Sequence, residues 1–161
     1  MKKFELSVQN LSDLCIQRQI MIATAESCTG GLIAGALTEV AGSSAFFDRG
    51  FVTYSNESKQ ALLGVDLNIL ENYGAVSAKC SQAMAQGALN NSNAQIAVSV
   101  TGIAGPGGGS ENKPVGLVYV GIATHETVDV VKCNFSGTRS DIRNLTVFKA
   151  LDLLIEAARA I

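Results

Sequence analysis

The fold is decided by residues 20–31, which read IMIATAESCTGG. Residues 20–25 form a short and mostly apolar run, which predicts a strand that is buried on both faces of a sheet. The run leads through a turn with two glycines into a segment with helical spacing, residues 32–40. A strand, a tight turn and a helix in this order indicate an α/β protein, in which ligands bind at the carboxyl ends of the strands.

Outward from this turn, apolar periodicity predicts the other helices and strands. We expect helices over residues 4–18, 32–40, around 59, around 70, over 77–89 and from 139 onward, and strands over residues 20–25, 46–54, 94–100, 115–123 and 128–135. The four residues 124–127 are few enough to join the last two strands as an antiparallel hairpin, so the sheet should be mixed. Thr138 and Asp141 have the spacing of a capping box at the start of the closing helix.

The chain has 161 residues, which is the size of one domain. We find no internal repeat and no linker, so residues 1–161 are expected to form one domain of class α/β, a three-layer α/β/α sandwich with a mixed sheet. Hydrophobic residues make up 47% and charged residues 16% of the sequence, which excludes a disordered chain. An apolar composition at this size also favours a homo-oligomer.

Charge and patterning restrict the partners. The net charge of −2 is not that of a general nucleic-acid binder. The apolar runs are too short to cross a bilayer, and polar residues interrupt what would be the apolar part of a signal peptide. The cysteines at 15, 28, 80 and 133 are widely separated and form no CxxC motif, as expected for reduced thiols. We therefore expect a cytoplasmic protein that binds neither nucleic acid nor membrane.

The scarcity of histidine and the lack of metal-binding motifs exclude several kinds of catalytic site. The only histidine, His125, lies in the predicted hairpin turn, away from the other candidates, and is interpreted as an ordinary turn residue. A Ser-His-Asp or Cys-His arrangement would need it as the base. No HExxH-like or DxD-like spacing points to a metal, so we predict no metal site.

Ser27 is the most informative single residue. A serine before a helix is most often an N-cap. Here, however, it follows a buried strand, and Thr29, Gly30 and Gly31 let backbone N–H groups approach an oxyanion or a phosphate. A hydroxyl beside such amides is the minimum equipment for acyl transfer. Cys28 is a competing nucleophile, but no histidine is available to hold it as a thiolate, so Ser27 is preferred.

Without a histidine, Lys59 is the best candidate for the base. It follows the predicted strand 46–54, and it must lose its charge near neutral pH to accept a proton. Burial and nearby positive charge are the means of lowering its pKa. Tyr54 could relay the proton or hold the amine. The ordinary alternative is a solvated helix lysine and a tyrosine at a strand end.

Two further segments suit an anionic ligand. The loop 101–109, which includes Thr101, Gly102 and Gly105, is neither a P-loop nor a Rossmann fingerprint, but its glycines suit backbone contact with a flat or anionic ligand. Its ordinary interpretation is a mobile connection. Arg139 and Arg143 lie four residues apart at a helix start, where they could clamp a phosphate. Surface ion pairing is the alternative for them.

Several of these segments recur together in a known family. In order along the chain they are residues 25–31 (AESCTGG), 50–59 (GFVTYSNESK), 62–65 (LLGV), 73–77 (YGAVS), 101–108 (TGIAGPGG), 113–116 (KPVG) and 137–143 (GTRSDIR). The ordered set closely resembles the CinA C-terminal domain family, the nicotinamide-nucleotide amidases also called PncC. It spans nearly the whole chain, and the sequence resembles the stand-alone form without the additional N-terminal domain of full-length CinA proteins.

The resemblance implies hydrolysis of the carboxamide of nicotinamide mononucleotide (NMN) to nicotinic acid mononucleotide and ammonia, without a cofactor. It implies a serine nucleophile assisted by lysine and tyrosine, carried here by Ser27, Lys59 and Tyr54. The residues expected to contact the substrate are Cys28, Thr29, Gly30, Gly31, Thr101, Gly102, Gly105, Arg139 and Arg143. Thr138 stands where the family often has Asp, a departure that bears on the orientation of Arg139.

Two other functions stay open from the sequence. A non-catalytic domain that binds a nucleotide or docks a partner, linked to competence or the DNA-damage response, would keep the glycine loop and the arginines but would need no neutral lysine. An amidase for a different carboxamide would keep the whole set. An ammonia-release assay with a small panel of carboxamides separates these interpretations.

Overall fold

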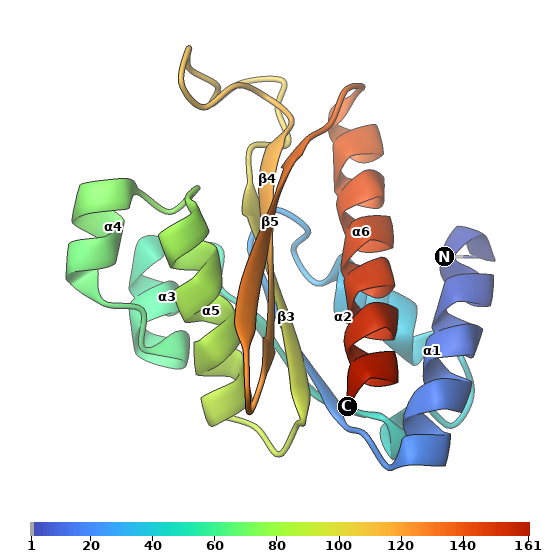
Figure 1. Cartoon of the computed structure of the whole chain (residues 1–161). Helices are drawn as coiled ribbons and strands as arrows, with labels where there is room; N and C mark the ends of the chain where they lie inside the picture. Colours follow the sequence, from blue (N-terminus) through green and yellow to red (C-terminus); the bar gives the residue numbers. More distant parts are fainter. Residues whose placement is uncertain (1) are drawn as a thin grey trace.

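A five-stranded mixed sheet forms the centre of the computed structural model, which describes residues 2–161 (Figure 1). The strands are β1 (Ile22–Glu26), β2 (Phe47–Val52), β3 (Ile96–Gly102), β4 (Leu117–Thr124) and β5 (Val128–Asn134), in the spatial order β2-β1-β3-β4-β5. β1 is parallel to both of its neighbours, whereas β3–β4 and β4–β5 are antiparallel. The predicted mixed sheet and its terminal hairpin are confirmed.

Helices cover both faces of this sheet. They are α1 (Glu5–Arg18), α2 (Leu32–Thr38), α3 (Asn56–Leu63), α4 (Leu67–Tyr73), α5 (Ala78–Asn90) and α6 (Arg139–Ala160), with 3-10 turns at Lys2–Phe4 and Ser43–Ala45. Figure 1 shows α1, α2 and α6 on one side of the sheet and α3, α4 and α5 on the other. The three-layer α/β/α architecture is therefore confirmed. Within the described residues, no helix is both long and apolar enough to span a bilayer.

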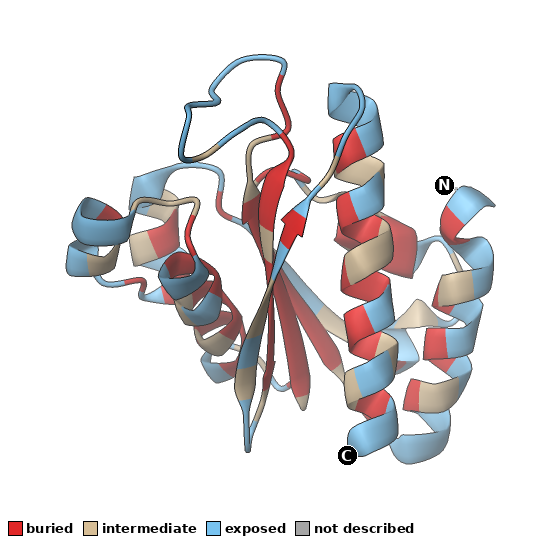
Figure 2. Cartoon of the chain, turned by 45° about the horizontal axis from the view of Figure 1, so that its top comes forward, coloured by how far each residue is buried: buried red, intermediate tan, exposed pale blue. Residues whose placement is uncertain are grey.

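The sheet is buried because apolar layers pack on both of its faces. Every residue of β1 is buried, as are the first six residues of β3 (Figure 2). On one face, α6 buries Ile142, Val147, Leu151 and Leu154 against the sheet. Full burial of a side chain of this kind contributes about 1.5–3 kcal/mol. The apolar run at residues 20–25 thus leads into β1, an inner strand of the sheet that is buried on both faces.

Element boundaries differ from the predictions by a few residues, for a physical reason. β1 was expected over residues 20–25 and β2 over residues 46–54, yet the ladder between them begins at Ile22 and Phe47. Ile20 and Phe46 are buried without belonging to a strand. An apolar pattern reports contact with the core, whereas a strand is defined by pairing, so the two need not begin at the same residue.

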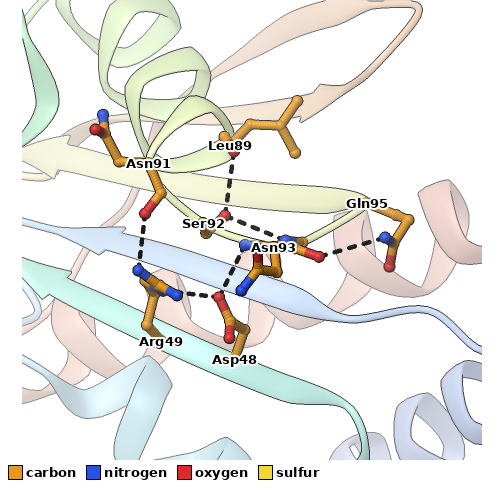
Figure 3. A network of polar contacts seen from close by, with 8 residues as sticks. Asp48, Arg49, Leu89, Asn91, Ser92, Asn93 and Gln95 are labelled. Carbon is orange, nitrogen blue, oxygen red and sulfur yellow. Dashed lines mark hydrogen bonds and ion pairs between the residues drawn. The ribbon is translucent and has the colours of Figure 1, made fainter.

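A polar network closes the sheet at the amino ends of its parallel strands (Figure 3). The Asp48 carboxylate accepts hydrogen bonds from the Arg49 side chain, at 2.7 Å, and from the backbone N–H of Asn93, at 3.0 Å. Arg49 also donates to the Asn91 carbonyl, at 3.1 Å. The Asn93 amide and, to a lesser degree, Arg49 hold the pKa of the Asp48 carboxyl below its usual range. This network joins the α5–β3 loop to β2.

The carboxyl ends of the parallel strands lie at the opposite end of the sheet. There β1 leads into α2 on one face, while β2 leads into α3 on the other face (Figure 1). Chain segments that leave neighbouring strands toward opposite faces create a crevice at the carboxyl ends of those strands. β4 begins at this same end of the sheet, because it is antiparallel to β3. α6 also begins there, because it follows β5, which ends opposite the start of β4.

Candidate active site

A pocket of about 300 Å³ lies at the carboxyl ends of the parallel strands. Ser27, Cys28, Tyr54, Lys59, Ala75, Val76, Thr101, Gly102, Ile103, Ala104, Gly105, Gly107, Gly108 and Arg139 line it. These residues come from the segments that follow β1, β2 and β3, from α3, from the α4–α5 connection and from the start of α6. The fold thus brings together most of the residues that the sequence singled out, although they are far apart in the chain.

Ser27 and Lys59 are in direct contact. The Lys59 Nζ lies 3.0 Å from the Ser27 Oγ and donates a hydrogen bond to the Thr53 carbonyl at 2.7 Å. Lys59 is only 1% exposed, and no ion pair to it occurs among the described residues. A charged ammonium in this place donates to the hydroxyl, whereas a neutral amine can accept the hydroxyl proton through its lone pair.

The environment of Lys59 favours its neutral form. Burial lowers the pKa of Lys59 below its ordinary value, because the charged form loses its hydration. Cys80 and Cys28 would oppose this only as thiolates. Burial raises the pKa of Cys80, and it raises that of Cys28 to about 11, so both are uncharged thiols near neutral pH.

Local sequence explains why Lys59 points inward. Ser55 caps α3: its hydroxyl accepts from the Ser58 amide at 3.1 Å, and the Ser58 hydroxyl accepts from the Ser55 amide at 3.1 Å. This capping box begins the helix immediately after the pocket wall. Lys59 and Leu63 are then one turn apart and are the buried residues of α3. Lys59 therefore occupies a position on the helix that would ordinarily hold an apolar side chain.

Cys28 lines the pocket beside Ser27, but burial raises the pKa of its thiol more than the nearby Arg143 and Lys59 lower it. Its pKa of about 11 means that it carries almost no thiolate at neutral pH. Cys28 is also one of four free, buried cysteines. The geometry therefore favours Ser27 over Cys28 as the nucleophile of the pair.

The turn after Ser27 differs from the expected helix start. Gly30 and Gly31 have positive φ angles of 57° and 101°, and α2 begins only at the next residue. The Gly30 amide donates to the Ser27 carbonyl at 3.0 Å, so it is not free for a ligand. Thr29, Gly30 and Gly31 are not among the residues that line the pocket. Their contribution is to turn the chain rather than to contact the cavity.

The first amides of α2 are also occupied. Glu26, which is fully buried, accepts from the Ile33 and Ala34 amides at 2.8 and 3.0 Å. Among the described residues, no other residue accepts a hydrogen bond from the N–H of Cys28. The amide that directly follows the serine is thus one of the backbone donors of the lining residues that a ligand could use.

Tyr54 and Arg139 meet at the mouth of the pocket. Arg139 donates to the Tyr54 hydroxyl at 3.1 Å and to the Gly105 carbonyl at 2.8 Å. Tyr54 is 62% exposed and makes no hydrogen bond with Lys59. The carbonyl of Thr53, rather than Tyr54, holds the Lys59 amine in place. Tyr54 instead orients Arg139.

Arg143 was expected to clamp a ligand together with Arg139, but it does not line the pocket. Its guanidinium donates to the carbonyls of Cys28 and Thr29, at 3.1 Å each. Although the two arginines lie one turn apart on α6, their side chains have different partners. Arg139 reaches the cavity, and Arg143 reaches the backbone behind it.

The glycine loop forms a further wall. Thr101, which is buried at the end of β3, donates to the Ala75 carbonyl at 2.8 Å and so ties the loop to the α4–α5 connection. Gly102 is needed because a Cβ there would lie 2.7 Å from the Leu117 carbonyl. The Lys113 ammonium donates to the Tyr73 carbonyl at 2.6 Å and anchors the far end of the loop. The loop is therefore tied down at several points.

Arg139 supplies the positive charge of the lining, because burial favours the neutral form of the other basic residue, Lys59. No Asp or Glu lines the pocket among the described residues. His125 is exposed in the β4–β5 turn, as the sequence predicted. Residues 2–161 contain no cluster of three His, Cys, Asp or Glu side chains that could hold a metal ion. The pocket therefore suits an anionic ligand.

Four contributors to the site were not singled out from the sequence. The Thr53 carbonyl is invisible to side-chain motifs. Ala75 and Val76 belong to the motif at residues 73–77, but they are apolar and carry no reactive group. Glu26 did carry a signal, because it is a carboxylate within an otherwise apolar strand. A buried acid immediately before a candidate nucleophile could have been singled out.

Fold and site together define an α/β protein with a serine–lysine pair at the carboxyl ends of its parallel strands. The sequence model described as CinA C-terminal domain matches residues 5–158. The chain is 55% identical over 141 residues to a competence-damage inducible protein of Caldicellulosiruptor bescii, covering 88% of this chain and 34% of the relative. It is 54% identical over 141 residues to the CinA-like protein of Endomicrobium trichonymphae, covering 88% and 33%.

Solved structures share the fold of the chain. The competence/damage inducible protein CihA of Agrobacterium tumefaciens is 49% identical with a TM-score of 0.88, covering 95% of this chain and 96% of that chain. A CinA superfamily protein of Klebsiella pneumoniae is 33% identical with a TM-score of 0.93, covering 98% of each chain. The chain belongs to the CinA family. It spans about a third of the length of the curated relatives it matches.

Proposed function

We propose that this domain is an amidase that hydrolyses the carboxamide of nicotinamide mononucleotide, giving nicotinic acid mononucleotide and ammonia. The observation that carries the proposal is the contact between the buried Lys59 amine and the Ser27 hydroxyl, at 3.0 Å, inside a pocket. A lysine that has no acidic partner and is kept from water is suited to act as a base near neutral pH. A domain that only binds a ligand would not require a buried lysine without an acidic partner.

In the first step, neutral Lys59 accepts the proton of the Ser27 hydroxyl while the Oγ attacks the carboxamide carbon. The Thr53 carbonyl, 2.7 Å from the Nζ, stabilises the ammonium that forms. The N–H of Cys28 donates to the oxygen that becomes negative. Lys59 then returns the proton to the departing nitrogen, so that ammonia leaves and an ester on Ser27 remains.

In the second step, a water molecule attacks the ester carbon and gives its proton to Lys59. The bond to the Ser27 Oγ breaks, the proton returns to that oxygen, and nicotinic acid mononucleotide leaves. Arg139 faces the same pocket, with Tyr54 and the Gly105 carbonyl fixing its guanidinium. In this proposal Arg139 receives the phosphate, supported by the backbone of Gly107 and Gly108.

The test is release of ammonia and of nicotinic acid mononucleotide from NMN by purified protein. Ser27→Ala is expected to lower kcat by about 10⁴-fold or more and to leave substrate binding intact. Lys59→Met should lower kcat similarly, because the two residues act as one unit. Ser7→Ala on α1 and Lys79→Met on α5 remove the same groups away from the pocket and should leave kcat unchanged.

Each other result has a definite meaning. Near-normal turnover by Ser27→Ala would contradict the nucleophile, and loss of turnover in Cys28→Ala alone would favour the thiol. Binding of NMN without turnover by the wild type would favour the alternative of a non-catalytic nucleotide-binding domain. Turnover of another carboxamide in preference to NMN would keep the mechanism and change the substrate.

A further inference from the structure

The turn that carries Ser27 is weakly held by its own hydrogen bonds. It has one internal contact, from the Gly30 amide to the Ser27 carbonyl at 3.0 Å, before the chain enters α2. Gly30 and Gly31 both adopt positive φ angles, and glycine loses more conformational freedom on folding than any other residue. Groups outside the turn must therefore supply part of its rigidity.

One such group is the carboxylate of Glu26. It is fully buried, and it forms no ion pair in the described part of the chain. Its Oε1 accepts from the Thr29 hydroxyl at 2.7 Å and from the Ile33 amide at 2.8 Å, and its Oε2 accepts from the Ala34 amide at 3.0 Å. A buried carboxylate persists only where hydrogen bonds compensate for its lost hydration. These three bonds join the last residue of β1 to the turn and to α2.

The second group is the guanidinium of Arg143, which approaches from α6. It donates through Nε to the Cys28 carbonyl and through Nη2 to the Thr29 carbonyl, at 3.1 Å each. The same Nη2 would lie 3.6 Å from a Cβ built at Gly30. The planar guanidinium fork suits two adjacent acceptors, which a single ammonium would not hold equally well.

We propose that Glu26 and Arg143 are positioning residues that clamp the nucleophile turn, residues 27–31, between β1, α2 and α6. The proposal rests on the proposed function, because its consequence is that the Ser27 Oγ stays within reach of the Lys59 Nζ. A displacement of about 1 Å at a reacting group can cost roughly 100-fold in rate. Neither Glu26 nor Arg143 lines the pocket. Both therefore act through the turn and not on the substrate.

This role separates kinetically from that of a phosphate ligand. A phosphate ligand mainly changes KM, because it binds the ground state and the transition state alike. A positioning residue mainly changes kcat. Arg143→Lys keeps the positive charge but loses the planar guanidinium with its two parallel donors. Binding of a substrate phosphate by this residue would therefore be largely preserved, whereas the contacts that clamp the turn would be lost.

The experiment compares Glu26→Gln, Arg143→Lys and Arg143→Met with two matched controls. Asp48→Asn alters a structural carboxylate at the opposite edge of the sheet, and Arg159→Met removes an exposed arginine from the other end of α6. For each protein, kcat and KM for NMN are measured together with amide hydrogen exchange of peptides covering residues 27–34. Exchange serves as a readout that needs no turnover.

We expect the three clamp variants to lower kcat by about 10- to 100-fold with KM within about twofold of the wild type. Their exchange in residues 27–34 should be at least about tenfold faster, with little change elsewhere. The controls should match the wild type in kcat and in this segment. Arg143→Lys should resemble Arg143→Met and not the wild type.

Two results would overturn the clamp: unchanged exchange in residues 27–34, or a raised KM with an unchanged kcat. A wild-type protein that does not hydrolyse NMN would instead contradict the proposed function. In that case the exchange comparison still decides whether Glu26 and Arg143 hold the turn. The two failures are therefore distinguishable.

Discussion

A buried amine without a carboxylate partner costs free energy of folding, and Lys59 is such an amine. Its Nζ has two oxygen neighbours, the Ser27 hydroxyl and the Thr53 carbonyl, and neither carries a charge. The cost is tolerated because the same isolation from water makes the amine a usable base. Activity and stability are therefore expected to oppose each other at this residue.

Lys59→Met should accordingly produce a protein that is more stable and inactive. Methionine fills a similar volume without a polar atom to desolvate. The loss of the two hydrogen bonds, to Ser27 and to Thr53, offsets only part of this gain, by about 1 kcal/mol each. A gain of 1 kcal/mol would raise Tm by about 2–4 °C at this size. Thermal unfolding at pH 7 checks the direction, with Lys79→Met as the exposed control. A lower Tm for Lys59→Met would mean that the charged form of Lys59 is stabilised in the folded protein.

The pH dependence of the reaction provides a second prediction at this scale. Because Lys59 acts in its neutral form, kcat/KM should rise with pH as the amine loses its proton and then become level. Burial lowers the pKa of Lys59, so the plateau should begin at lower pH than for an ordinary lysine, whose pKa is about 10.4. The profile is measured above pH 7, where the substrate phosphate is already almost fully ionised.

The same profile distinguishes the two candidate nucleophiles. A reaction that used the Cys28 thiolate would rise toward pH 11, where the pKa of that thiol lies, and would be lost in Cys28→Ala. A rise that is retained in Cys28→Ala and ends at lower pH is the expected result for Lys59. A rise in Cys28→Ala that continues beyond about pH 10.4, the pKa of an ordinary lysine, would contradict a buried lysine of lowered pKa as the base.

At the scale of helices and strands, the order of elements could be predicted, but side-chain partners could not. Apolar periodicity located each of the main helices and the β4–β5 hairpin, because period and burial are linked directly. Spacing also placed Arg139 and Arg143 on one face of α6. It could not indicate that Arg139 reaches the pocket while Arg143, one turn later, contacts the backbone behind Ser27. That difference depends on how α6 packs against the turn that carries Ser27.

The contact between α3 and α5 provides a prediction in which two effects have opposite signs. Helix propensity alone favours Gly87→Ala by about 1 kcal/mol. A Cβ at Gly87, however, would overlap the backbone carbonyl of Leu63, so the two helices would have to move apart. We expect overlap to dominate and to lower the free energy of unfolding by about 1–3 kcal/mol.

Because α3 also carries Lys59, the same substitution should lower kcat. Urea unfolding and NMN hydrolysis measure the two effects. Gln82→Ala, on an exposed position of α5, is the control and should change stability by no more than about 0.5 kcal/mol. A Gly87→Ala protein that is more stable and fully active would show that α3 shifts without cost.

At the scale of the whole molecule, the fold class was predictable and the site only in part. The ordered motifs predicted Ser27, Lys59 and Arg139 as parts of one site, and topology explains why they meet: each follows a segment that ends at the same edge of the sheet. The Thr53 carbonyl and the Glu26 contacts depend on three-dimensional packing and have no motif of their own. Cytoplasmic localisation and assembly into a homo-oligomer stay predictions.

The pocket as a whole makes a last prediction, because a ligand that binds only the folded chain stabilises it by mass action. Ser27→Ala permits the measurement without turnover. NMN at 100 times its Kd should add about 2.7 kcal/mol, which corresponds to a rise in Tm of roughly 5–10 °C. Since Arg139 is the basic residue at the pocket mouth, Arg139→Met in the same background should reduce the rise for NMN but not for nicotinamide riboside, which lacks the phosphate. An equal loss for both compounds would mean that Arg139 shapes the pocket instead of binding the phosphate, and no rise with NMN at any concentration would contradict the substrate.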